Sequence, residues 1–396
     1  MTSVKVESLQ SSPVGTRFLA DVERVFEEVQ AVDPSAWLRA NEPPAGLHPA
    51  VVALALFRHP DITLDALIAG AKQRISSRRP QMHTFVPLYT TNHCDSECKM
   101  CAMRKGNDRL IRKFAGKRTI EQQLQVLFDH ERVRGVGLLT GEYHDEYTRL
   151  ANAFRIGWTA RRALDMGFER VYVNIGSMSD GEIEVLGEWL DADAAVTMCV
   201  FQETYNRRVY DRFMGRASVY PKGDYERRIS SFDRWLDAGL RYVNPGVLVG
   251  LHKDVEEEFV ALLVHVHHLA QRGAVVDISL PRLRPAQGTR NASGVDDDVY
   301  LRVLAAIAFA CPEQRIVLTN REEEAFWMRA VELCGVFSPG SPDVAPYRAD
   351  APAINELNTS QFLVGDLRRP RDLLRQVQRG GHDVDLFAEA PDAGTA

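Results

Sequence analysis

Short apolar runs alternate with amphipathic helical stretches through most of the chain, beginning near His83. Each run has the length and composition of a buried strand in a parallel sheet. The runs lie at 84–90, 135–140, 171–175, 196–201, 243–249, 275–280, 315–319 and 335–338. Eight strand–helix alternations over about 250 residues match a (β/α)8 TIM barrel, which is an α/β fold. An open, doubly wound sheet is the alternative.

Helical periodicity is present on both sides of this region. Ahead of it, the apolar spacing predicts helices at 16–29, 50–57 and 64–75, and Thr63 is placed to cap the third. Behind it, a polar segment leads to a short predicted helix near 366–378. Basic residues alternate with leucines there at helical spacing, which predicts a helix packed on the surface.

These patterns divide the chain into three parts. Residues 1–80 are expected to form an N-terminal helical extension, with 1–15 loose, and residues 81–345 to form the barrel. Residues 346–396 are expected to form a C-terminal extension that ends in a disordered Gly/Asp/Ala-rich tail.

Two helix starts and one helix face carry more local predictions. Thr119 to Gln122 and Ser179 to Glu182 both have the spacing of a capping box. The helix at 254–272 carries one apolar stripe, formed by Phe259, Leu262, Leu263, Val266 and Leu269. Its histidines at 265, 267 and 268 have no nearby carboxylate in the sequence, so a solvated face is expected rather than a metal site.

Composition adds few constraints. The formal net charge of −6, with 45% hydrophobic and 26% charged residues, gives no reason to expect a nucleic-acid or membrane partner. The chain has no apolar run of about 18 residues and no signal-peptide pattern at its start. Three of its six cysteines are clustered and the others are scattered, unlike a disulfide framework. We therefore expect a reducing, cytoplasmic location.

The clustered cysteines are the strongest chemical signal. Cys94, Cys98 and Cys101 can wrap one loop around an iron–sulfur cube and supply three of its four ligands. The fourth iron then keeps an open coordination site. Structural zinc is the alternative, with His93 or a distant residue as fourth ligand. The basic residues that follow, including Arg104, suit an anionic cofactor beside the cube.

The C-x3-C-x2-C spacing, with Met100 just before the last cysteine, resembles that of the radical S-adenosylmethionine enzymes. The resemblance implies a TIM barrel of the radical SAM type and a [4Fe–4S] cluster whose open iron is chelated by S-adenosyl-L-methionine. It also implies an external one-electron reductant of flavodoxin or ferredoxin type. In that superfamily the reduced cluster cleaves the cofactor and releases a 5′-deoxyadenosyl radical.

Polar residues follow the predicted strands where a barrel builds its active site, at the carboxyl ends. Each of these residues could instead have a purely structural role. Glu142 and Glu203 could stabilise helix N-termini, Arg282 and Arg321 could form ion pairs at the rim, and Tyr89 could belong to the core. The strand-end residues are Gly141, Glu142, Asn174, Gly176, Ser177, Gln202, Glu203, Gly246, Val247, Leu248, Gly250, Ser279–Arg282, Thr319–Glu322 and Ser338–Ser341.

Three motifs narrow the resemblance to the aromatic amino-acid lyases of the superfamily: 201–205, 279–285 and 319–322. Longer stretches at 85–92, 134–143 and 340–347 look like the tryptophan lyases of nosiheptide-type thiopeptide biosynthesis. That likeness implies hydrogen abstraction from the amine of L-tryptophan and cleavage of the Cα–carboxyl bond. The carboxyl fragment would then migrate to indole C2, and Cα would be lost together with the nitrogen, which leaves 3-methyl-2-indolic acid.

The resemblance also implies roles for individual residues. Arg321 matches the arginine that holds the substrate carboxylate, and Tyr89 and Ser338 match residues that line the substrate, so these three are the expected catalytic and substrate-binding residues. Contacts to S-adenosylmethionine are expected from Met100, Glu142, Ser177, Gln202, Glu203, Arg228 and Val247, although Val247 could instead belong to the barrel core.

Departures from the family pattern keep other functions open. No cysteine follows Cys334, which argues against the second cluster of the hydrogenase-maturation lyases. Asn320 and Pro339 replace the usual threonine and alanine next to the expected substrate pocket. A tyrosine lyase that makes p-cresol and dehydroglycine is therefore the first alternative. A non-catalytic iron–sulfur or zinc-binding protein is the second.

Overall fold

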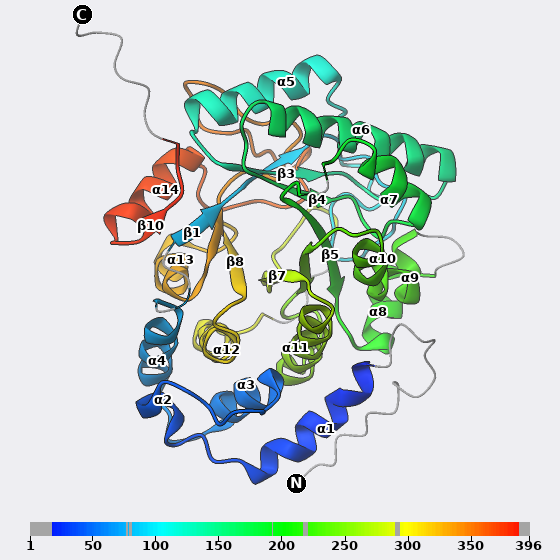
Figure 1. The fold of residues 1–396 in the computed structure, drawn as a ribbon. Helices are drawn as coiled ribbons and strands as arrows, with labels where there is room; N and C mark the ends of the chain where they lie inside the picture. The colour runs from blue at the N-terminus through cyan, green and yellow to red at the C-terminus, as the bar shows by residue number, and fades with distance from the viewer. Residues whose placement is uncertain are drawn as a thin grey trace, which may run out of the picture.

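The computed structural model describes residues 18–76, 78, 81–191, 193–216, 221–289 and 294–387, and its centre is a ring of parallel strands (Figure 1). Both segments expected to be loose or disordered, 1–15 and the end of the tail, lie outside the described residues. The strands are β1 Gln81–Thr84, β2 Val86–Tyr89, β3 Gly135–Leu139, β4 Arg170–Asn174, β5 Val196–Glu203, β6 Tyr242–Val247, β7 Val275–Ser279, β8 Arg315–Thr319, β9 Val336–Ser338 and β10 Asp383–Val384.

The first predicted strand is divided at Phe85 into β1 and β2, and this division closes the ring. β1 pairs with β9, whereas β2 pairs with β3, and every neighbouring pair between them is parallel. The (β/α)8 prediction is therefore confirmed. β10 was not predicted; it adds to β1 outside the ring, with Gln81 beside Asp383.

Strand alternation decides which side chains face the barrel interior. Successive side chains of a strand point to opposite sides. Val86, Leu88, Val136 and Leu138 are fully buried under the outer helices. The alternate positions face the interior cavity: Phe85, Pro87, Tyr89, Gly137, Leu139, Tyr172, Asn174, Cys199, Phe201, Asn244, Ser279, Val317, Thr319 and Ser338.

Helices cover the outside of the ring. The stripe predicted for 254–272 is buried in α11, and packing this apolar face on the strands stabilises the barrel. The outer helices are α5 Lys117–Gln125, α6 Glu146–Asp165, α7 Asp180–Gly187, α8 Arg207–Met214, α9 Tyr225–Ile229, α10 Ser231–Asp237, α11 Val255–Gln271, α12 Asp297–Ala310 and α13 Glu324–Ala330.

The N-terminal helices pack against α11 and α12 (Figure 1). One side chain of α12, Arg302, donates hydrogen bonds to the carbonyl oxygens of Leu56, Phe57, His59 and Ile62 at 2.6–3.1 Å. The carbonyls of Leu56, Phe57 and His59 lie at the C-terminal end of α3, where carbonyl groups lack intrahelical donors. Arg302 therefore caps α3 and ties it to the barrel. The helices are α1 Asp21–Glu28, α2 Trp37–Ala40, α3 Pro49–Arg58 and α4 Leu64–Ser76.

Three of the local predictions have mixed outcomes. Ser179 and Glu182 form a reciprocal capping box at the start of α7, as predicted. The capping box at Thr119 is wrong, because α5 already begins at Lys117 and Gly116 precedes it. The solvated face is wrong for His265, which is 1% exposed and hydrogen-bonds Tyr205 Oη through Nδ1 at 2.7 Å.

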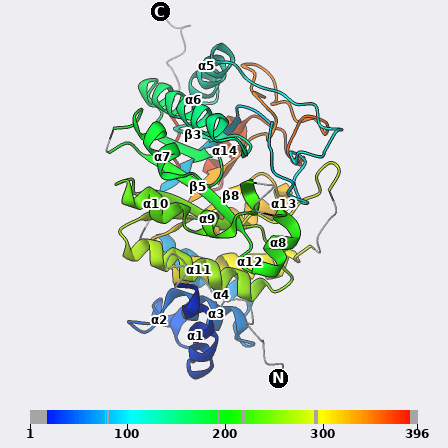
Figure 2. The ribbon, with the colours of Figure 1, turned by 90° about the vertical axis from the view of Figure 1, so that its right-hand side faces the viewer.

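Beyond β9 the chain runs without a helix until α14, Pro370–Arg379, which buries Leu373, Leu374 and Val377 as the surface-helix prediction requires. Figure 2 shows this segment, in orange, beside the cyan loop that follows β2. Their backbones are joined by a hydrogen bond from Ile111 N to Asn358 O at 2.7 Å. Within the described ranges, no helix is long and apolar enough to cross a membrane.

Candidate active site

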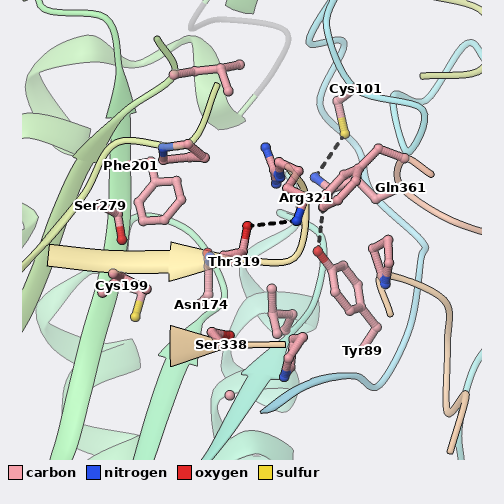
Figure 3. Close-up of a pocket in the computed structure, with 18 of the residues that line it drawn as sticks. Tyr89, Cys101, Asn174, Cys199, Phe201, Ser279, Thr319, Arg321, Ser338 and Gln361 are labelled. Atoms are coloured by element: carbon pink, nitrogen blue, oxygen red, sulfur yellow. Dashed lines mark hydrogen bonds between the residues drawn. The ribbon is translucent and has the colours of Figure 1, made fainter. Parts of the chain in front are cut away.

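A cavity opens at the carboxyl ends of the strands, inside the ring (Figure 3). All three clustered cysteines line it, together with side chains from strands, loops and the segment after β9. Of the residues selected from the sequence, it brings together Tyr89, Cys94, Cys98, Met100, Cys101, Glu142, Glu203, Arg228, Arg321 and Ser338.

The cysteine loop follows β2 directly, and buried polar groups hold its start in place. The Asn92 amide donates to Ile111 O at 2.9 Å and to Thr359 O at 2.8 Å. Across the loop, a Cβ atom built on Gly141 would lie 2.1 Å from His93 O and 2.6 Å from Cys94 Cβ. Glycine is needed at this position because the end of β3 approaches the loop so closely.

The three thiols fit an iron–sulfur cluster better than a single zinc ion. None of the six cysteines forms a disulfide. Among the residues that the structure describes, no three Cys, His, Asp or Glu side chains converge to hold one metal ion, and His93 is exposed. Burial raises the pKa of Cys94 to about 11 and that of Cys98 well above its usual value. Thiolates here therefore need nearby cations, which a cluster supplies through its irons.

Two buried ion pairs face the cavity. Arg228 Nη1 donates to Glu142 Oε1 at 2.8 Å, and Lys222 Nζ donates to Glu203 Oε1 at 2.5 Å. Burial acts to lower the pKa of Arg228, but Glu142, Tyr210 and Glu203 together raise it above its usual value. Gly176, at φ +93°, leaves room for Glu142, since a Cβ atom there would lie 2.3 Å from the carboxyl carbon.

Glu203 reaches its partner through an irregular strand end. It adopts a left-handed conformation at φ 68°, and the pairing of β5 with β6 shifts register between Phe201 and Glu203. A bulge of this kind re-aims a side chain, and strained backbone of this type is concentrated at functional sites.

Arg321 differs from the other cavity cations, because its guanidinium forms no ion pair or hydrogen bond with any described residue. Its Nε atom is fully buried, and the guanidinium lies over the ring of Phe362 at 3.8 Å. Burial lowers the pKa of this group. By contrast, Arg282 forms ion pairs at the rim of the barrel, as the structural explanation for this residue predicted. Its partners are Glu322 and, at 2.6 Å, Asp297.

Tyr89 and Ser338 are both buried on the cavity wall. The Tyr89 hydroxyl donates to Gln361 Oε1 at 2.5 Å, and burial raises its pKa. Ser338, at the end of β9, is 3% exposed. These side chains lie in the same view as Arg321 in Figure 3, on the side of the cavity that β2, β8 and β9 form.

Three of the expected cofactor contacts lie outside this cavity. Ser177 lines a smaller polar pocket behind Glu142, and its carbonyl accepts from Arg227 Nη2 at 3.1 Å. Gln202 is 3% exposed, and its Nε2 has no partner among the described residues. Val247 is fully buried in β6, which agrees with the barrel-core alternative.

Several cavity residues were not selected from the sequence. Phe85 and Tyr172 stack with ring centroids 4.0 Å apart, and strand alternation could have identified both. Lys222 lies in a short 3₁₀ helix, Gln361 and Phe362 lie in a loop, and no local pattern marks any of them. Their place in the cavity depends on contacts with distant parts of the chain.

No family model matches the chain. The 2-iminoacetate synthase of Salmonella typhimurium is 26% identical over 335 residues, which cover 79% of this chain and 80% of that protein. The FeFe-hydrogenase maturase HydG from Carboxydothermus hydrogenoformans has a TM-score of 0.80 at 21% identity, over 95% of this chain and 86% of that one. Methylornithine synthase (PylB) has a TM-score of 0.64 at 12% identity, over 93% and 97%.

The likeness to the two solved structures concerns the fold, and the likeness to the synthase extends to the sequence. Both agree with the three-thiol loop, which presents its sulfurs to the interior of a parallel barrel. The comparisons do not identify the substrate. The chain is similar over most of its length to radical S-adenosylmethionine enzymes, and its cofactors are a [4Fe–4S] cluster and S-adenosyl-L-methionine.

Proposed function

We propose that this enzyme is a radical lyase that breaks the side chain of an aromatic L-amino acid. The observation that carries the proposal is the guanidinium of Arg321, which has no ion-pair or hydrogen-bond partner among the described residues and lines the same cavity as the three clustered thiols. A buried cation without an anionic partner is costly, so it favours an anionic ligand. A planar guanidinium binds a carboxylate through two parallel hydrogen bonds.

The rest of the cavity suits the remainder of such a substrate. The cofactors supply a 5′-deoxyadenosyl radical when the cluster is reduced, by an external one-electron donor of flavodoxin or ferredoxin type. Arg321 would hold the carboxylate, and the amine would then face the cofactor. The stacked rings of Phe85 and Tyr172, deeper in the barrel, offer an apolar surface to an aromatic side chain.

The relatives favour tyrosine as the substrate. The name 2-iminoacetate synthase describes a protein that makes 2-iminoacetate, which is dehydroglycine. Cleavage of tyrosine to p-cresol and dehydroglycine by this chain would follow the same pattern.

Tryptophan is the second candidate, and the stretches at 85–92, 134–143 and 340–347 favour it through their likeness to thiopeptide tryptophan lyases. Its product would be 3-methyl-2-indolic acid. Asn320 lines the cavity, and both ends of its side-chain amide bond the scaffold. Its amide donates to Asp366 O at 2.9 Å and accepts from Gly340 N at 3.1 Å, so it joins two loops of the scaffold.

Product analysis separates the candidates. The reconstituted, reduced enzyme is incubated anaerobically with S-adenosylmethionine and either tyrosine or tryptophan, and the products are identified by mass spectrometry. We expect p-cresol with dehydroglycine from tyrosine, or 3-methyl-2-indolic acid from tryptophan. The proposal fails if 5′-deoxyadenosine accumulates and neither amino acid is cleaved.

A further inference from the structure

The segment after β9 contributes five residues to the cavity: Gly340 and Pro342 at its start, and Gln361, Phe362 and Val364 further along. Hydrogen bonds fix the part of this segment near Gln361 to the start of the same segment and to the cysteine loop. Thr359 Oγ1 donates to Asp343 Oδ2 at 2.5 Å on the β9 side, and Thr359 O accepts from the Asn92 amide at 2.8 Å on the cysteine-loop side. The backbone beside Gln361 is therefore held at two points.

The Gln361 amide bridges the cluster loop and Tyr89 (Figure 3). Its Nε2 donates to Cys101 Sγ at 3.3 Å, and its Oε1 accepts from Tyr89 Oη at 2.5 Å. The chemistry supports this orientation of the amide. A ligating thiolate has no proton, so the opposite orientation would set an oxygen acceptor against a sulfur acceptor.

Gln361 is unusual among the donors to the cluster sulfurs. Cys94 Sγ accepts from the backbone N–H groups of Ser96 and Glu142, both at 3.4 Å. Within the part of the chain that the structure describes, Gln361 is the one side chain that donates to a cluster cysteine. A hydrogen bond to a ligating sulfur stabilises the reduced, more negative cluster, and such bonds help to set its reduction potential.

We propose that Gln361 is a positioning residue that makes the cluster easier to reduce, and that Tyr89 fixes the orientation of its amide. Tyr89 then influences the cluster through Gln361, in addition to lining the cavity. The proposal rests on the cofactors of this enzyme class and not on which amino acid it cleaves. A second contact strengthens the link to the cavity, because the next residue, Phe362, covers the Arg321 guanidinium.

The test is a redox titration of the full chain with its cluster reconstituted and without any amino acid, followed by electron paramagnetic resonance. Gln361→Leu and Gln361→Met both remove the amide donor, and the methionine variant keeps the length of the side chain. Iron and sulfide analysis first establishes whether each variant holds a cluster. One variant that holds a cluster is enough for the titration. We expect a more negative midpoint potential than that of the wild type in both.

Gln123→Leu is the matched control. Gln123 is a buried glutamine whose amide bonds the backbone of Tyr347 at 2.8 and 2.9 Å, so it also holds the segment after β9 but donates to no cysteine. The midpoint potential of the cluster in Gln123→Leu should equal that of the wild type. Tyr89→Phe should shift the potential in the same direction as the Gln361 variants, by a smaller amount, because the amide is kept but loses its anchor.

Two results would overturn the proposal: a wild-type potential in the Gln361 variants, or an equal shift in Gln123→Leu, which would indicate general loosening of the segment. A failure of the substrate proposal looks different. In that case tyrosine and tryptophan both stay intact, while the difference in potential between the wild type and the Gln361 variants remains.

Discussion

At the scale of single residues, the surroundings of a side chain decide its role. Arg282 and Arg321 follow two strands of the same barrel and look alike in the sequence. The structure gives Arg282 two carboxylate partners and Arg321 none among the described residues. This difference could not be predicted locally, because Glu322 follows another strand and Phe362 lies in the segment after β9.

Arg321→Lys keeps the positive charge and loses the planar, two-point grip on a carboxylate. The substrate should still bind but tilt, and a misplacement of about 1 Å can cost on the order of 100-fold in rate. We expect 5′-deoxyadenosine to form while cleavage of the amino acid falls by about that factor. Both products are measured in the same sample.

Arg282→Lys is the control for Arg321→Lys, because it changes the same side chain in a rim ion pair. It should lower the melting temperature and leave the ratio of 5′-deoxyadenosine to cleaved amino acid unchanged. If Arg321→Lys behaves in the same way as this control, Arg321 has a structural role and not an anchoring one.

The cysteines give a second residue-scale prediction. Alanine at Cys94, Cys98 or Cys101 should abolish the brown absorbance of the cluster and the reductive cleavage of S-adenosylmethionine. Alanine at Cys199, Cys311 or Cys334, all buried, should leave the iron content unchanged and cost about 1–3 kcal/mol of stability. Iron analysis and thermal melting check both statements. Cofactor cleavage by a cluster-free variant would contradict the ligand assignment.

At the scale of elements, the sequence predicted what local pattern controls. The eight apolar runs all became strands, because a buried parallel strand is apolar on both faces. The division at Phe85 and the pairing of β10 depend on distant partners and were missed. The same holds for Gln361, which no periodicity marks and which reaches the cavity only because Asn92 and Asp343 hold its segment.

The two predicted capping boxes provide a matched pair of variants. Ser179→Ala removes a real cap from α7, so the free energy of unfolding should fall by about 1 kcal/mol. Thr119→Ala changes an exposed residue inside α5, where alanine is a better helix former, and should have little effect or stabilise slightly. Denaturant unfolding of the apo-protein measures both. Equal losses would mean that Thr119 also caps a helix.

His265 should make the packing of α11 sensitive to acid. Burial lowers the pKa of this histidine to about 3, against about 6.5 in the unfolded chain. The unfolded state therefore binds more protons below pH 6.5, and stability falls as the pH decreases from there. By pH 4 the loss from this group is on the order of 3 kcal/mol.

The check is urea unfolding of the apo-protein between pH 8 and pH 4, for the wild type and His265→Gln. Glutamine can still accept the hydrogen bond from Tyr205 but does not titrate. The variant should be less stable at pH 8 and show a shallower dependence on pH. Parallel pH profiles for the two proteins would show that His265 contributes nothing to acid sensitivity.

At the scale of the whole molecule, the barrel gathers the carboxyl ends of its strands around one cavity, and the segment after β9 completes the cavity wall. Strand order alone placed the cysteine loop, Glu142, Glu203, Arg321 and Ser338 at this end. The identity of the aromatic substrate depends on the shape of the interior. That shape is set jointly by several strands, so no single motif specifies it.

The most direct test of the proposed function is the stoichiometry of one reaction mixture. Reduced wild-type enzyme receives S-adenosylmethionine with ¹³C-labelled tyrosine and ¹³C-labelled tryptophan, and Cys98→Ala serves as the blank. We predict that one of the two amino acids is cleaved, with one 5′-deoxyadenosine formed per labelled fragment and neither product in the blank. Formation of 5′-deoxyadenosine at the same rate with and without amino acids, and with no labelled fragment, would contradict the account.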